Sequence, residues 1–137
     1  MNKKILRSIG AISAGFISGA ILSIGTDFIL DNLGVMSMEN FKQTSLIVVF
    51  IVIIYRFVFN MIGSYLTAGL APGNPMKHVI IIGVIGTIFG ISGSIAMWDN
   101  AIPLYNIAII LISFPSAWLG GQIFIKKTKK WQKKQII

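Results

Sequence analysis

Four long apolar runs constrain what this chain can fold into more than any other feature. They cover roughly residues 8–33, 45–70, 78–98 and 104–125, and a helix needs about 20 mostly apolar residues to cross a bilayer. No run alternates apolar and polar residues, as the strands of a membrane barrel do. Because the links between the runs are short, successive helices should be antiparallel neighbours. The sequence therefore predicts an all-α integral membrane protein, one domain over 1–137 folded as an up-down-up-down bundle of four transmembrane helices.

Composition excludes a soluble domain. Only 12% of the 137 residues are charged and the mean hydropathy is +0.81, whereas soluble domains are about 25% charged. The chain has no cysteine, which excludes disulfides, thiolate metal sites, thiol catalysis and lipid-modified cysteines.

The sequence carries no motif of an enzyme. It has no phosphate-binding loop, no zinc-protease helix, no nucleophile elbow and no pair of catalytic carboxylates. We therefore expect no enzyme activity, no cofactor and no metal site. The single histidine, His78, is interpreted as an interfacial residue at the start of a helix rather than as a ligand.

Basic residues predict how the chain is oriented. Of the twelve lysines and arginines, Lys42 falls in an outer link and Arg56 lies within a span. The other ten lie on one side of a four-span protein: Lys3, Lys4, Arg7, Lys77, Lys126, Lys127, Lys129, Lys130, Lys133 and Lys134. This asymmetry follows the positive-inside rule, so both termini are expected in the cytoplasm. Cleavage after "SGA" at 18–20 would leave three spans instead. The apolar run continues well beyond a normal signal segment, which favours an uncleaved first helix.

The net charge of +8 is concentrated in the segment 126–137. Each lysine close to an anionic leaflet contributes about 1 kcal/mol of binding free energy, so lipid headgroups are the expected partner of this tail. Nucleic acid would use the same charges, but a tail anchored beside a bilayer favours lipid, and we expect no nucleic-acid binding.

Small residues recur along faces of the predicted helices. Gly15 and Gly19 belong to a stripe that repeats every fourth residue in the first run. Further glycines mark the third and fourth runs, namely Gly86, Gly90 and Gly121. Small side chains let helix backbones approach closely in lipid. The stripes predict packing within the bundle or the seam of a homo-oligomer, and the sequence leaves both open.

The links and the fourth run carry further signals. "LAPGNPMKH" (70–78) predicts a tight turn. The link 31–43 is expected to hold an interfacial segment with Met36, Met38 and Phe41, while Trp98 and Tyr105 are interpreted as interfacial aromatics. Proline removes a helix hydrogen bond, so position 115 predicts a kink in the fourth helix.

A line of polar residues crosses the second run. Arg56, Asn60, Ser64 and Thr67 share one helix face, and a guanidinium at the centre of a bilayer costs about 2.5–3.5 kcal/mol on insertion scales. Asp27 is the one acid clearly within a span, and we expect it to neutralise the arginine. Asn60 and the neighbouring tyrosine at position 55 should complete the hydrogen bonds of the guanidinium. These residues predict either an ion-coupled or polar-substrate site, or a charge pair that fixes helix register.

Several blocks of the chain are similar to those of a known group. "RSIGAISAGF", "GSYLTAGLAPGNPMKH", "IAMWD" and "PSAWLGG" resemble, in the same order, a group of small bacterial four-helix membrane proteins without an assigned activity. The resemblance implies a bacterial inner-membrane location. The small multidrug-resistance transporters have a similar length, but they rely on a glutamate deep in the first helix. The first run here has none, which argues against drug–proton exchange.

Two functions follow as hypotheses. The first is a small transporter or permeation protein that acts as an oligomer, because four helices alone leave little room for a substrate route. The second is a non-transporting accessory subunit that binds other membrane proteins through its glycine faces. A water-accessible cavity around Arg56 and Asn60 would favour the transporter, and a dry charge pair the accessory subunit.

The charge asymmetry generates a topological prediction. Reporter fusions at Asn74 and Ile137 should report the cytoplasm, and fusions at Glu39 and Asp99 should report the outside, because loop lysines and arginines are retained inside. An external signal from the fusion at Ile137 would exclude four spans.

Overall fold

The computed structural model describes residues 3–37 and 39–136, with side chains described as far as Lys130. Within these residues the chain forms four α-helices and one short 3₁₀ helix, and no strand. The helices are α1 (Lys3–Asn32), α2 (Leu46–Leu70), α3 (Pro75–Ala96) and α4 (Pro103–Ile136), and η1 (Phe41–Gln43) lies between α1 and α2. The all-helical prediction is confirmed for this part of the chain.

All four α-helices are long and apolar enough to cross a membrane. Their outer faces carry large apolar side chains that are more than half exposed, such as Ile21, Ile54, Ile95 and Leu111. A soluble protein rarely exposes continuous apolar surface on this scale. Lipid is the solvent that such faces fit.

Local sequence signals explain where two of the helices begin. The side chain of Ser45 accepts a hydrogen bond from the amide of Val48 at the start of α2. At the start of α3 the side chain of Asn74 accepts from two amides, and Pro75 occupies the first turn, where its missing N–H costs nothing. Gly73 has a φ of 89°, so the predicted turn uses a backbone conformation that favours glycine.

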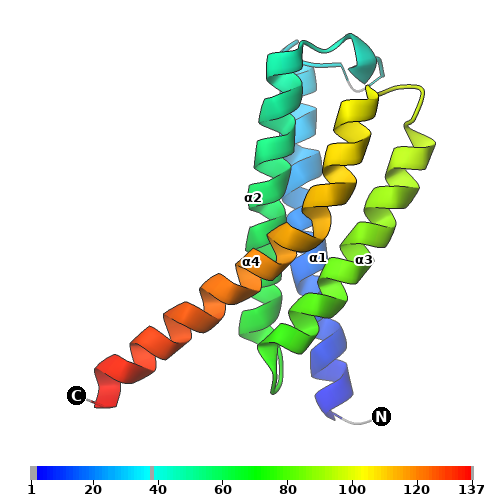
Figure 1. Cartoon of the computed structure of the whole chain (residues 1–137). Helices are drawn as coiled ribbons and strands as arrows, with labels where there is room; N and C mark the ends of the chain where they lie inside the picture. Colours follow the sequence, from blue (N-terminus) through cyan, green and yellow to red (C-terminus); the bar gives the residue numbers. More distant parts are fainter. Residues whose placement is uncertain (1–2, 38, 137) are drawn as a thin grey trace.

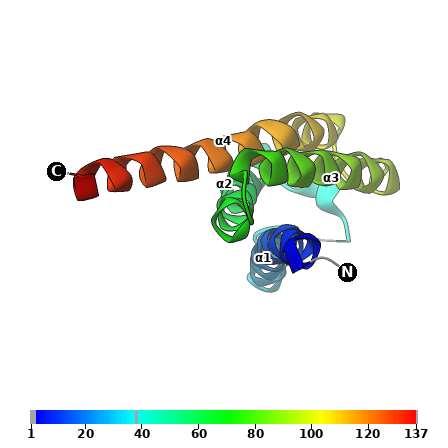
Figure 2. The ribbon, with the colours of Figure 1, turned by 90° about the horizontal axis from the view of Figure 1, so that it is seen from below.

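The helices are arranged unevenly around α2. Figure 2 shows α1 on one side of α2, with α4 and α3 side by side on the other. Among the described residues α1 makes no contact with α4. Both termini and the link between α2 and α3 lie toward the same end of the molecule (Figure 1). As a result, α2 lies between α1 and α4, while α3 packs mainly on α4.

The end of the bundle that holds the other two links has a compact apolar core. Met36 and Phe41 are buried there with Val49 and Ala101, and the ring of Tyr105 lies 4.7 Å from that of Phe41. The link 31–43 therefore closes this end of the bundle. For its described residues the interfacial location stays a prediction. Met38 lies outside them.

The two predicted interfacial aromatics differ in their surroundings. Trp98 is half exposed, whereas Tyr105 is only 7% exposed, so the ring of Tyr105 packs inside the bundle. The cause is the folded-back link, whose Phe41 covers the tyrosine ring.

Helix α4 is longer than its predicted span and continues through the basic segment. Its ribbon bends in the orange part of Figure 1 and then leaves the bundle, and Pro115 lies inside the helix. Lys126, Lys127, Lys129 and Lys130 are exposed on this part of the helix. The side chains of Lys133 and Lys134 lie outside those described.

Three glycines allow the closest helix crossings. A Cβ on Gly15 of α1 would collide with Thr67 Oγ1 and the carbonyl of Gly63 on α2, and a Cβ on Gly120 of α4 would collide with Ser64 Oγ. At Gly63 an added Cβ would lie 2.5 Å from the carbonyl oxygen of Gly15. These positions show how small residues bring α1 and α4 close to α2.

The other predicted packing glycines behave differently from one another. A Cβ on Gly121 would lie 2.8 Å from Val79, and one on Gly90 would lie 3.1 Å from Ser113 Oγ, whereas one on Gly19 would meet only an ordinary contact at 3.5 Å. At Gly86 an added Cβ meets nothing within 4 Å, so this glycine does not serve packing within the bundle, and the seam of a homo-oligomer stays a prediction. Gly86 faces open space because α1 and α3 diverge.

The crossing at Gly15 generates a stability prediction. Gly15→Ala should destabilise the protein by about 1–3 kcal/mol, the usual cost of overpacking, because its methyl group collides with Thr67 and the Gly63 carbonyl. Gly25→Ala on the same helix meets nothing within 4 Å and should be neutral or stabilising. Thermal unfolding in detergent measures both variants, and equal stability would contradict the assigned crossing.

Candidate functional site

The site begins with Arg56 near the middle of α2. Its Nη2 donates to Asp27 Oδ2 of α1, and the two side chains form an ion pair. Tyr55, the neighbour of Arg56 on α2, donates its hydroxyl to the second carboxylate oxygen, Asp27 Oδ1. Both oxygens of the carboxylate therefore have a donor, which is what a carboxylate buried in an apolar region requires.

The guanidinium also rests on an aromatic ring. Arg56 Cζ lies 5.9 Å from the ring centroid of Tyr105 on α4, within the usual range of a cation–π contact. The side chain of Arg56 is 32% exposed, whereas that of Asp27 is 7% exposed. Consequently, the cation is the more accessible member of the pair.

Asn60 lies one turn further along α2. The sequence predicted a hydrogen bond between Asn60 and Arg56, but Asn60 bonds other groups. Its Nδ2 donates to the carbonyl of Ser113 at 2.9 Å and to the hydroxyl of Ser116, both on α4. Tyr55 likewise bonds the carboxylate and not the guanidinium. These two details of the predicted network are wrong because α4, and not α1, covers the Asn60 side of α2.

Ser64 and Thr67 complete the predicted polar line but belong to helix packing. Thr67 Oγ1 donates to the carbonyl of Ala11 on α1 at 3.0 Å, and Ser64 Oγ donates to Met61 of its own helix at 3.0 Å. Both side chains are essentially inaccessible. Their interpretation as members of a shared site with Arg56 is therefore not supported by their contacts.

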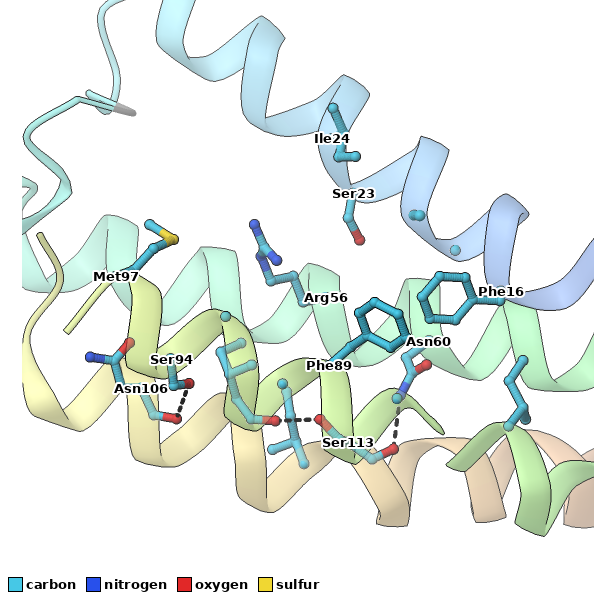
Figure 3. Close-up of a pocket in the computed structure, with 18 of the residues that line it drawn as sticks. Phe16, Ser23, Ile24, Arg56, Asn60, Phe89, Ser94, Met97, Asn106 and Ser113 are labelled. Atoms are coloured by element: carbon cyan, nitrogen blue, oxygen red, sulfur yellow. Dashed lines mark hydrogen bonds between the residues drawn. The ribbon is translucent and has the colours of Figure 1, made fainter. Parts of the chain in front are cut away.

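A cavity of about 320 Å³ lies between α1, α3 and α4, with α2 behind it. Figure 3 shows Arg56 projecting from α2 into this space, opposite Ser23 of α1 and near Phe89 of α3. Gly19 from α1 and the pair Gly86 and Gly90 from α3 also line it. The cavity exists because small residues face one another there without touching.

Polar residues of α4 that the sequence did not single out also line the cavity. Asn106 is 1% exposed, and its carbonyl accepts from Ser94 Oγ of α3 at 3.2 Å. Ser113 lines the cavity beside Asn60. Asn106 in an otherwise apolar run is a signal that could have identified this wall.

His78 lies apart from the cavity, at the start of α3. Its Nε2 lies 2.8 Å from Ser8 Oγ of α1, and its Nδ1 lies 2.9 Å from the carbonyl of Asn74. The ring is buried and links α1 to the turn before α3. Within the described residues, no group of histidines and acids is suited to hold a metal ion.

The ion pair generates a prediction for a double-mutant cycle. Asp27→Leu should cost about 3–5 kcal/mol, the usual cost of breaking a buried pair, since the stranded guanidinium cannot lose its proton. Arg56→Leu should cost less, because the carboxyl group can take a proton and keeps the hydrogen bond from Tyr55. The double variant should recover much of the stability lost in Asp27→Leu.

Unfolding in detergent measures the cycle, with Asp31→Leu as the control. Asp31 lies one turn further along α1 and is exposed. Asp31→Leu should therefore lower the free energy of unfolding by much less than Asp27→Leu does. Additive single effects would show that the two side chains do not stabilise each other.

Comparisons with known proteins give no relative for this chain. No protein-family model, no curated protein and no solved structure matches it.

Proposed function

We propose that the protein is a small transporter or permeation protein of the bacterial cytoplasmic membrane. The observation that carries the proposal is the cavity of about 320 Å³ whose wall includes Arg56 and Asn60. Ionisable residues that face a cavity inside a membrane usually mark the path of a substrate. The volume is in the range of about 300–1,000 Å³ that is usual for small-molecule sites.

The proposed topology is up-down-up-down with both termini in the cytoplasm. Ten of the twelve lysines and arginines support it because they fall near the two termini and in the first turn of α3. The position of both termini at one end of the molecule agrees with it (Figure 1). The bacterial inner-membrane location is supported by the resemblance of the sequence blocks. In this orientation the exposed lysines of α4 would meet anionic lipid headgroups.

A homo-oligomer is part of the proposal. Near the cavity α1 and α3 meet at the rings of Phe16 and Phe89, whose centroids are 5.1 Å apart. Because α1 does not reach α4, this side of the cavity has a single layer of side chains. A second copy packed there would complete a pathway that four helices enclose only in part.

An accessory subunit without transport remains the second candidate. It is favoured by Gly86 and Gly93 of α3, where an added Cβ would meet nothing within 4 Å. A helix of another membrane protein could approach α3 closely over these residues. In that case the cavity would be filled by the partner and closed to water.

Cysteine labelling distinguishes the two candidates. The chain has no cysteine, so Ser23→Cys places a single thiol in the cavity wall. A transporter should expose this thiol to a membrane-impermeant thiosulfonate reagent added to right-side-out vesicles and also to inside-out vesicles, because a permeation route must open to both faces.

Ile21→Cys is the matched control because it lies two residues away on α1 and is 64% exposed on the lipid-facing surface. It should react slowly from either side. If Ser23→Cys reacts no faster than this control in both kinds of vesicle, the cavity is dry and the transporter proposal fails.

A further inference from the structure

Arg56 is the only charged residue among the described residues that line the cavity, and its side chain is 32% exposed. We infer that its ligand is an amphipathic molecule with a carboxylate or another oxyanion at one end and a compact apolar body. The inference rests on the proposed function, since it names the class of substrate for the same site.

Three buried polar atoms lack a hydrogen-bond partner among the described residues, namely Thr44 Oγ1, Arg56 Nε and Asn106 Nδ2. Arg56 and Asn106 line the cavity, but these two nitrogens are themselves buried. A ligand in the cavity would therefore meet Arg56 through the exposed part of its side chain, which is 32% exposed.

The charges beside the cavity also favour a ligand that carries an oxyanion. The guanidinium of Arg56 is accessible from the cavity while its counter-charge, Asp27, is buried on the far side of the pair. A ligand in the cavity is therefore closer to the positive member than to the negative one. Arginine is also the residue best suited to bind an oxyanion, because its planar donors match two oxygens at once.

The remainder of the cavity is apolar and limits the size of the ligand. Phe16 and Phe89 form one wall (Figure 3), and Ile82 and Ile109 lie on the others. Its volume is about 320 Å³. A small aliphatic or aromatic carboxylate fits this space with its body on the rings and its oxygens toward Arg56.

The same chemistry could come from solution or from the bilayer. A free carboxylate would enter from water, whereas an anionic lipid would insert its headgroup from the side where α1 and α3 diverge. The test therefore compares both sources.

The test uses Ser23→Cys in vesicles of phosphatidylcholine and follows protection of the thiol. Octanoate, octanol and octylammonium share a chain and differ in charge. At ten times its dissociation constant, octanoate should slow labelling by about tenfold, since the site is then about nine-tenths occupied. Octanol and octylammonium should protect poorly. Ile21→Cys controls for partition of each compound into the bilayer.

A second measurement needs no ligand. An anionic thiosulfonate should label Ser23→Cys faster than a cationic one of equal size, because Arg56 attracts it, and high salt should reduce the ratio. Equal or reversed rates, together with protection by octylammonium, would overturn the inference and leave the water-filled cavity in place. Absence of labelling by either reagent would instead overturn the proposed function itself.

Two variants and a lipid exchange complete the test. Arg56→Gln should weaken protection by octanoate at least severalfold, and Asn100→Leu, in the exposed link after α3, should leave it unchanged. Unaltered protection in Arg56→Gln counts against binding of the oxyanion by Arg56. Protection by phosphatidylglycerol in the vesicles, without octanoate, assigns the oxyanion to a lipid, and its absence assigns it to a soluble carboxylate.

Discussion

The ion pair between Arg56 and Asp27 is the interaction on which the arrangement of the helices depends. An arginine near the middle of a span cannot shed its charge, so a counter-charge must lie within reach of its side chain. Asp27 meets this requirement only if α1 packs against α2 at that level. Tyr55 then supplies the second hydrogen bond to the carboxylate. The ion pair thereby joins α1 and α2 at one level of the bundle.

Small residues serve two opposite purposes in this fold. At Gly15 and Gly63 their absent side chains let two backbones meet, while at Gly86 the same absence leaves open volume. Gly19 lies between these extremes and lines the cavity. Whether a glycine allows a close contact or leaves a cavity depends on whether the facing helix approaches it. Helices α1 and α3 move apart toward the end of the bundle opposite the termini (Figure 1). Packing and cavity formation therefore follow from one type of residue.

The sequence predicted the features that depend on one helix at a time. The four spans follow from apolar runs, although α3 begins at Pro75, three residues before the predicted run and inside the predicted turn. Periodicity also shows that Arg56 and Asn60 lie near one another on α2. It cannot show which helix covers each part of that face, and in the structure α1 receives Arg56 while α4 receives Asn60. For the same reason the polar wall from α4 was missed.

Helix α1 is attached to α2 at two separated levels. Near one end the hydroxyl of Thr67 bonds the carbonyl of Ala11 beside the crossing at Gly15, and near the other end Asp27 holds Arg56. Gly15 and Asp27 are about 18 Å apart along the helix axis, at 1.5 Å per residue. A rod held at two such points cannot swing about either one unless the other is released. Opening at one end therefore requires that the attachment at that end break first, and the intact attachment then becomes the pivot.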